Sequence, residues 1–256
     1  MLSRHFARAV RSFSNSAIKP WSHVGLKTSN LFRLHLFEGF NVPKFVHYDK
    51  EHFRDIAKKR SNITHENFFA HINKIFPSDI KYFCLRSSGL NGPYASKFGI
   101  KRSDILTEGT IIANSIDEGT LLVQEFIAGP NTKSGVLFID TNKNITRIKA
   151  IPGLCDPVIN RERCDIYYLN RESGEIAESF LRKDKRSKFF IDKFIEENVD
   201  PEGKGTLSIE EIKTIWEAGL KVKRMLPRDQ VSIGNEVRWT FRDGQLYVLR
   251  TNSLKN

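Results

Sequence analysis

The sequence predicts an α+β fold, built either as one large domain or as two small lobes around a sizeable core. Two observations carry this prediction. Segments with strand-like and helix-like apolar patterns follow one another in mixed order along the 256 residues. Apolar residues make up 39% of the chain and charged residues 28%, with 19 phenylalanines, which is enough material for a core and excludes the disordered and collagen-like classes.

The first predicted helix of the folded part lies around residue 30. Leu31, Leu34 and Phe37 recur there at helical spacing, and Gly39 is a stop signal. Val42–Val46 then reads as the opening of a short strand.

The pattern of residues 49–77 is again helical, and the apolar positions that carry it are Phe53, Ile56, Phe68, Ile72 and Ile75. Lys81–Leu85 is a predicted strand. It runs into residues 86–93, which are rich in glycine and serine and are predicted to form a turn whose backbone N–H groups face an anion.

The second half of the chain is predicted to contain strands, two helices and a closing hairpin. The expected strands are Thr120–Ile127, Gly135–Asp140, Ile145–Ala150 and Asp165–Leu169. Helices are expected at residues 177–198 and 208–225, and the second opens with the capping-box pattern of Ser208 and Glu211. The hairpin pairs Glu236–Phe241 with Leu246–Leu249 through a turn at Asp243-Gly244.

Residues 1–20 have the composition of a mitochondrial transit peptide. The segment is serine-rich and basic, and the chain has no acidic residue before Glu38. On a helix, one apolar stripe would be formed by Leu2, Phe6, Ala9 and Phe13. We therefore expect import into the mitochondrial matrix; the alternative is an ordinary amphipathic helix of the fold.

The net charge, the uncharged stretches and the cysteines narrow the class of protein further. The net charge is +11, and removal of residues 1–20 with their four basic side chains leaves 11 − 4 = +7. The uncharged stretches are too short to cross a bilayer, so no membrane span is expected. Three cysteines without metal-ligand spacing indicate a reducing compartment and idle, buried thiols.

Several short motifs occur in a fixed order between about residues 24 and 252. They are Gly25–Leu31 with Gly39 and Val42-Pro43, Leu85–Ser88, Val123–Ile127 with Ser134–Phe138, Gly153–Asp156 with Asp165–Tyr167 and Glu172–Ile176, and Val237–Trp239 with Asp243–Thr251. In this order they resemble the nucleotide-binding domain of the phosphoenolpyruvate synthase and pyruvate phosphate dikinase family, a relative of the ATP-grasp fold. The resemblance implies a two-lobed, ATP-grasp-like domain, with residues 21–120 as the N-terminal lobe and residues 121–256 as the C-terminal lobe.

The same resemblance implies a site for ATP or another nucleotide. Lys27 would reach the phosphates and Arg86 would clamp them in a bidentate fork. Gln124, Glu125 and Ile127 would belong to the hinge between the lobes, whose backbone faces the adenine edge, and Asp156 takes the place of an acidic metal-side residue. The alternatives are a solvated Lys27, an Arg86 that pairs with a structural acid, and a hinge that is a plain core strand.

The closing hairpin departs from the family. Where the family places a Glu and a Gln to hold magnesium and then an Arg, this chain has Arg238, Arg250 and Asn252. A guanidinium repels a hard cation, so magnesium is doubtful and no metal ligand is assigned. A turn of three residues would place Arg238 opposite Arg250 on one face, and a two-residue turn would put them on opposite faces. If the cleft binds a ligand, we expect both arginines to contact its phosphate or acidic group directly, without magnesium.

These departures predict a pseudoenzyme, a phosphotransferase-like domain with a degraded metal site and no assigned catalytic residue. The second hypothesis is a non-catalytic subunit or RNA-associated factor of a mitochondrial assembly, which would use the basic run Arg182–Lys188 for contact; that run is otherwise a solvated helix face. Residues 200–211 resemble a calcium-binding EF-hand loop, but Lys204 stands where a ligand belongs, so calcium binding is disfavoured.

Overall fold

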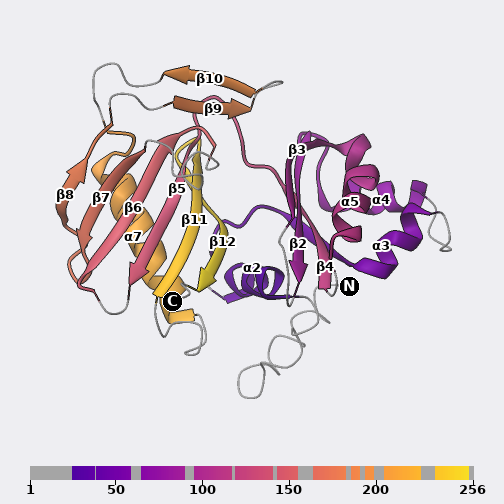
Figure 1. The fold of residues 1–256 in the computed structure, drawn as a ribbon, viewed down its shortest axis with the longest axis horizontal. Coiled ribbons are helices and arrows are strands. Elements are labelled where there is room, and N and C mark those ends of the chain that lie inside the picture. Colours follow the sequence, from indigo (N-terminus) through magenta and orange to yellow (C-terminus); the bar gives the residue numbers. More distant parts are fainter. Residues whose placement is uncertain are drawn as a thin grey trace.

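A computed structural model describes residues 25–37, 39–58, 65–89, 95–116, 119–140, 143–154, 164–182, 186–190, 194–198, 205–225 and 234–253. These residues form two lobes, each built on an antiparallel sheet, with one helix between them (Figure 1). The α+β class and the two-lobed architecture are therefore confirmed. The expected transit peptide and Asp156 lie outside the described residues.

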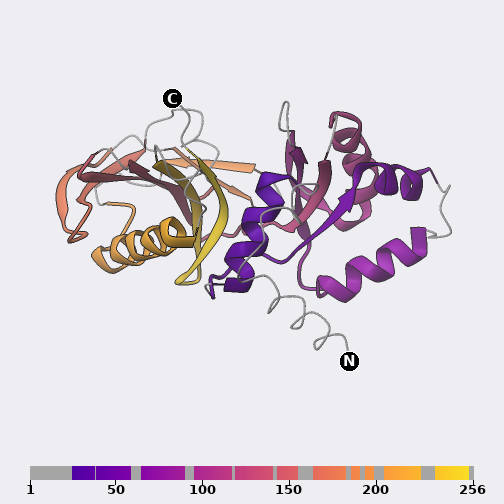
Figure 2. The ribbon, with the colours of Figure 1, turned by 90° about the horizontal axis from the view of Figure 1, so that it is seen from below.

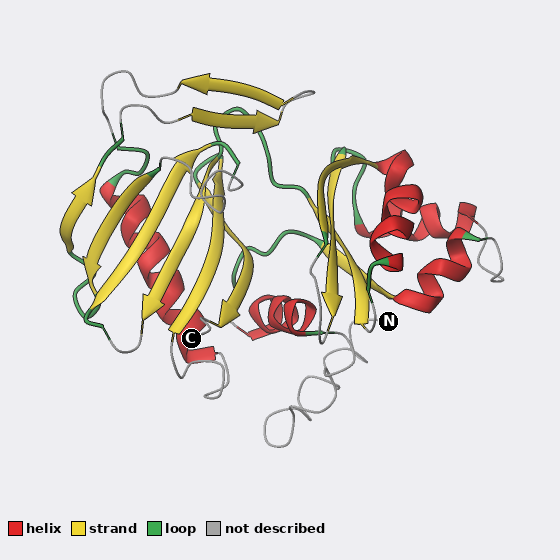
Figure 3. Ribbon diagram, in the orientation of Figure 1, coloured by secondary structure: helices red, strands yellow, loops and turns green. Residues whose placement is uncertain are grey.

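The N-terminal lobe is a four-stranded sheet in the order β1-β4-β2-β3, and every pairing in it is antiparallel. Its strands are β1 (Phe45–Asp49), β2 (Tyr82–Gly89), β3 (Ser96–Lys101) and β4 (Gly119–Glu125). The outer face is covered by α3 (Lys50–Ala57), α4 (His65–Ile75) and α5 (Ile105–Asn114), which follows a short 3₁₀ turn at Arg102–Asp104 (Figure 3).

The core of this lobe follows from the spacing of apolar residues in its helices and from their alternation in its strands. Phe53 and Ile56 of α3 and Phe68 and Ile72 of α4 are buried, as their helical spacing predicted. They pack on the outer face of the sheet, where alternate strand residues point: Phe83, Leu85, Leu121 and Val123. The opposite face of the same sheet carries Leu122, which is buried in a second core cluster.

The C-terminal lobe is a six-stranded antiparallel sheet in the order β12-β11-β5-β6-β7-β8. The strands are β5 (Lys133–Asp140), β6 (Ile145–Pro152), β7 (Asp165–Asn170), β8 (Ile176–Phe180), β11 (Gly234–Arg242) and β12 (Gln245–Ser253). The helix α7 (Ile209–Met225) covers one face (Figure 2), where Ile212, Ile215 and Val222 pack on Leu137 and Trp239.

Helix α2 (Leu26–Phe37) lies between the two sheets. Leu31 and Leu34, at the predicted spacing, are buried in the core of the C-terminal lobe together with Leu122 of the N-terminal sheet. The helix ends before Gly39, whose φ is +63°. The following strand begins at Phe45 instead of Val42, because Pro43 has no N–H to donate to a neighbouring strand.

The predicted helix at residues 177–198 is wrong. The structure has β8 there and then a separate hairpin of β9 (Arg186–Phe190) and β10 (Phe194–Asn198). Pairing of β8 with β7 completes the sheet, and such tertiary pairing overrides a weak local helix preference. The hairpin lies at the upper end of the C-terminal sheet in Figure 1, and β9 contacts β6.

The predicted turn that begins at Arg86 is also wrong in its first half. Strand β2 continues to Gly89, so Ser87 pairs with Leu121 and Ser88 with Thr120 of β4. The Ser87 N–H donates to the carbonyl oxygen of Ala95 over 2.9 Å and is thus not available to an anion. Residues 90–94 of the expected turn lie outside the described part of the chain.

The crossing between the lobes follows β4. The whole of β4 belongs to the N-terminal sheet, so the chain leaves that sheet after Glu125. Strand β3 and helix α5 were not predicted from the sequence. Within the described residues, none of the helices has the length and apolar content needed to cross a membrane.

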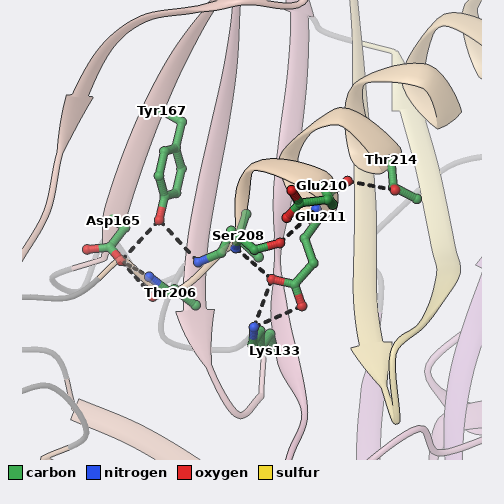
Figure 4. A network of polar contacts seen from close by, with 9 residues as sticks. Lys133, Asp165, Tyr167, Thr206, Ser208, Glu210, Glu211 and Thr214 are labelled. Carbon is green, nitrogen blue, oxygen red and sulfur yellow. Dashed lines mark hydrogen bonds and ion pairs between the residues drawn. The ribbon is translucent and has the colours of Figure 1, made fainter.

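A polar network fixes the start of α7 to the sheet (Figure 4). Asp165 is fully buried and accepts hydrogen bonds from the N–H of Arg182 over 2.8 Å and from the N–H and hydroxyl of Thr206 over 2.7 and 2.6 Å. The predicted capping box is confirmed: the Ser208 N–H donates to Glu211 over 2.8 Å, and the Glu211 N–H donates to the Ser208 hydroxyl over 3.2 Å. Glu211, the last residue of the EF-hand-like stretch, is thus engaged as a cap.

Candidate anion-binding site

Four cationic side chains converge where the N-terminal sheet, α2 and the closing hairpin meet. They are Lys27 on α2, Arg86 on β2, Arg238 on β11 and Arg250 on β12. Lys27 and Arg86 are buried, with 5% and 8% of their surface exposed, and the side chains of Arg238 and Arg250 are 18% and 17% exposed. We call these four residues the cation cluster.

The first turn of α2 is held tightly against β2, and this places Lys27. Gly25 has a φ of +76°, and a Cβ at this position would clash with the Ser88 carbonyl, so the close approach requires glycine. The Thr28 N–H donates to the Ser88 hydroxyl over 3.1 Å. The Lys27 ammonium donates to the Ser87 carbonyl oxygen over 2.9 Å, which excludes the reading of Lys27 as a solvated lysine.

The neighbouring charges perturb Lys27. Burial, and then the positive charges of Arg250 and Arg86, lower the pKa of Lys27 from 10.5 to about 7; Cys84 opposes this, and Arg238 adds the smallest lowering effect. Three guanidinium groups therefore act on one amine. The cluster favours an anion strongly, because an anion would relieve this repulsion.

The pH dependence of stability provides a test of this geometry. Since the pKa of Lys27 is lower in the folded chain than in the unfolded chain, the folded state binds fewer protons between pH 7 and 10.5, and the free energy of unfolding rises with pH over that window. We expect the unfolding free energy of wild type to rise relative to that of Lys27→Met by about 1.4 kcal/mol per pH unit above pH 7, because methionine does not titrate. Urea unfolding at several pH values measures it, and a difference that does not change with pH would contradict the perturbed amine.

Arg86 is positioned by three contacts. Its Nε donates to the Cys84 Sγ over 2.9 Å, its Nη1 donates to the Leu249 carbonyl oxygen over 3.5 Å, and its guanidinium lies 5.6 Å from the centre of the Phe98 ring. The contact with Leu249 links β2 of one lobe to β12 of the other. Arg86 is thus not held by a structural acid in these contacts.

Arg238 lies directly opposite Arg250, although the turn has two residues, for which the sequence argument placed the arginines on opposite faces. Arg242 pairs with Gln245 across Asp243-Gly244, whose positive φ values of 52° and 76° suit such a turn. A bulge between Trp239 and Arg238 then shifts the register by one residue. The conclusion about the shared face therefore holds, while the reason given for it was wrong.

Sequence reasoning missed Glu236. Its carboxylate accepts from the Arg238 Nε over 2.7 Å and lies 3.9 Å from the Arg250 Nη2, so one acid is shared between two opposed arginines. A carboxylate of the chain itself therefore relieves the repulsion between the two arginines, whereas the sequence predicted their contact with a bound phosphate or acidic group. The signal was present, because residues 236 and 238 lie on the same face of one strand.

The cation cluster does not suit a divalent metal ion. Its ligand positions carry guanidinium groups, which supply only N–H donors, and Glu236 is already paired with two of them. Within the residues that the structure describes, no group of three or more His, Cys, Asp or Glu side chains could hold a metal.

The hinge residues lie apart from the cluster, at the end of β4. The N–H groups of Glu125 and Phe126 donate to the Lys44 and Tyr82 carbonyl oxygens, so the sheet uses both. Among the described residues the N–H of Ile127 has no backbone acceptor, and the buried Nε2 of Gln124 has no hydrogen-bond partner. These two donors are what the hinge offers to a ligand.

A pocket of about 260 Å³ lies beside the hinge. Glu125 and Arg242, whose side chains lie 3.4 Å apart, line it together with Asp79, Lys81, Tyr82, Phe126 and Pro130. Phe126 also packs 6.1 Å from Phe98, the ring under the Arg86 guanidinium. Two aromatic rings therefore connect the hinge pocket to the cation cluster.

No protein-family model matches the chain, and no curated protein matches its sequence. Among solved structures, D-alanine–D-alanine ligase from Bacillus anthracis complexed with ATP matches with a TM-score of 0.45 and 13% identity over 89% of this chain and 52% of that one. D-cycloserine synthetase matches with a TM-score of 0.48 and 10% identity over 91% and 63%. N5-carboxyaminoimidazole synthase from Aspergillus clavatus, in complex with ADP and 5-aminoimidazole ribonucleotide, matches with 0.48 and 9% over 91% and 46%.

The matched structures are ATP-grasp enzymes, and the chain spans about half the length of the first of them. At these TM-scores and identities the likeness carries no argument about the chemistry of this chain.

Proposed function

We propose that the chain is an ATP-grasp-like nucleotide-binding domain, related to that of pyruvate phosphate dikinase, which binds ATP or another nucleotide through its phosphates without magnesium. The observation that carries this proposal is the convergence of Lys27, Arg86, Arg238 and Arg250 from four different elements. Phosphotransferase activity is reduced or lost, because the positions that would hold the metal carry arginine.

The residues suit a nucleotide triphosphate. Guanidinium groups form charge-assisted, bidentate hydrogen bonds with phosphate oxygens, and a cluster with one shared carboxylate keeps an excess of positive charge. At the other end of the site, the Ile127 N–H and the Gln124 amide are donors for a base edge. ATP would supply a transferable phosphoryl group when bound; the chain's own residues hold its charge and orient it.

The basic, acid-free residues 1–20 support a location in the mitochondrial matrix. Import of the full chain into isolated mitochondria, with loss of the N-terminal segment, is the outcome that this location predicts.

Calorimetric titration of the chain lacking residues 1–20 with ATP, with and without magnesium, tests the proposal. We expect binding that does not need magnesium and that Lys27→Ala weakens at least tenfold, because one charge-assisted hydrogen bond contributes about 1.5–3 kcal/mol. Lys213→Ala, an exposed lysine on α7, is the matched control and leaves the affinity unchanged. Absence of binding, or binding that a chelator abolishes, would overturn the proposal.

A further inference from the structure

The cation cluster continues across the face of the six-stranded sheet that lies opposite α7. The strand register places one row across four strands: Arg250, Arg238, Val136 and Lys149. Since neighbouring strands lie about 4.8 Å apart, Lys149 is roughly 14 Å from Arg250. A single compact anion bound at the cation cluster would not reach from Arg250 to Lys149.

The neighbouring row on the same face holds one arginine between two aromatic rings, and an acid follows each ring: Glu236 pairs with Phe138 at one end and Glu178 with Tyr168 at the other. Phe138, Arg147 and Tyr168 are paired in this row on β5, β6 and β7. The Arg147 guanidinium lies 4.6 Å from the centre of the Phe138 ring, and its buried Nε has no hydrogen-bond partner among the described residues. Tyr168 packs edge to face with Phe180 at 6.0 Å, and 45% of Phe180 is exposed.

The first residue of the basic run that the sequence singled out, Arg182, lies against strand β7. Arg182 is fixed by the hydrogen bond of its N–H to Asp165. Burial raises the pKa of the neighbouring Cys164 thiol; the charges of Lys149, Arg182 and Arg147 lower it, and that of Asp165 raises it further. Strand β9 contacts β6, the strand of Arg147 and Lys149.

Acidic groups on this face of the described strands are few. Glu236 is engaged by the cation cluster, Asp140 is the last residue of β5, and Glu178 stands on the edge strand β8. The central part of the face is therefore positively charged and carries rings between its charges.

We propose that this face binds a single-stranded nucleic acid, whose phosphates contact Arg147, Lys149 and the cation cluster and whose bases stack on Tyr168 and Phe180. A row of cations alone would suit any polyanion, but interleaved rings add stacking, which only unpaired bases provide. The inference goes beyond the proposed nucleotide binding but shares the cation cluster with it. An acidic protein segment is disfavoured because it would leave the rings without partners.

Fluorescence anisotropy with a labelled oligouridylate of about 12 nucleotides tests the inference on the chain lacking residues 1–20. We expect binding that weakens with salt. Arg147→Gln/Lys149→Gln is expected to lower the affinity at least tenfold and to reduce the slope of log K against log salt by about 1.4, since two phosphate contacts are removed. Lys213→Gln/Lys221→Gln, on the α7 side of the sheet, is the matched control and changes neither.

The aromatic contribution has its own variant. Phe180→Ala, at an exposed edge position, is expected to weaken the oligouridylate about tenfold and to leave the binding of heparin, a polyanion without bases, unchanged. Equal losses for both probes, or no RNA binding at all, would overturn the inference. Arg147→Gln/Lys149→Gln leaves the cation cluster intact, so a variant that still binds ATP but has lost RNA binding supports the inference. If wild type binds RNA but not ATP, only the proposed function is overturned.

Discussion

Replacement of Asp165 by alanine is expected to lower the free energy of unfolding by about 4 kcal/mol, the largest stability effect that we expect from a single side chain. The carboxylate is fully buried and accepts hydrogen bonds from three donors of Arg182 and Thr206 at 2.6–2.8 Å, while the Tyr167 hydroxyl lies 3.5 Å away. Its removal leaves buried donors without acceptors, each at a cost of about 1–3 kcal/mol.

The variant Asp165→Asn separates the contribution of the carboxylate's charge to stability from that of its shape. The amide keeps one acceptor oxygen, so we expect a smaller loss of about 2 kcal/mol. Glu217→Ala, an exposed acid on α7, serves as the control and is expected to stay within about 0.5 kcal/mol of wild type. Urea unfolding measures all three, and an Asp165→Ala variant as stable as Glu217→Ala would show that the network of Figure 4 does not hold the start of α7.

The elements that the sequence predicted well are those with a strong local signal. Helix α7 has its capping box and apolar stripe, and the closing hairpin has Asp243-Gly244 between alternating residues. The elements that it missed depend on distant partners. Strand β8 is fully exposed and is a strand because β7 pairs with it, which no local pattern of residues 176–180 reveals.

The candidate site shows the same division. The resemblance picked out Lys27, Arg86, Arg238 and Arg250, and the structure brings all four together. It placed Gln124, Glu125 and Ile127 at the hinge, where the structure also has them, but β4 uses the Glu125 N–H. The register of the hairpin could not be predicted from the sequence, because a bulge adds one unpaired residue to a strand and has no compositional signature here.

The exchange of the two opposed arginines for the residues of the related family is expected to change how the site holds phosphate. Arg238→Glu/Arg250→Gln removes two cations from the cluster, so binding of ATP without metal should weaken about 100-fold. The new carboxylate would stand beside Glu236, which loses both of its arginine partners. Carboxylate and amide oxygens are magnesium ligands, so we expect magnesium to restore binding in this variant and a chelator to abolish it.

Arg238→Lys/Arg250→Lys is the matched control, because it keeps both charges and introduces no metal ligand; we expect its ATP binding to stay independent of magnesium. A second readout does not depend on any ligand. Arg250 and Arg238 both lower the pKa of Lys27, so the exchange to Glu and Gln should raise that pKa and move the onset of the pH-dependent stability above pH 7, whereas the lysine control should leave it in place. An exchange variant that binds ATP without metal as tightly as wild type, with an unchanged pH profile, would show that these arginines neither contact phosphate nor act on Lys27.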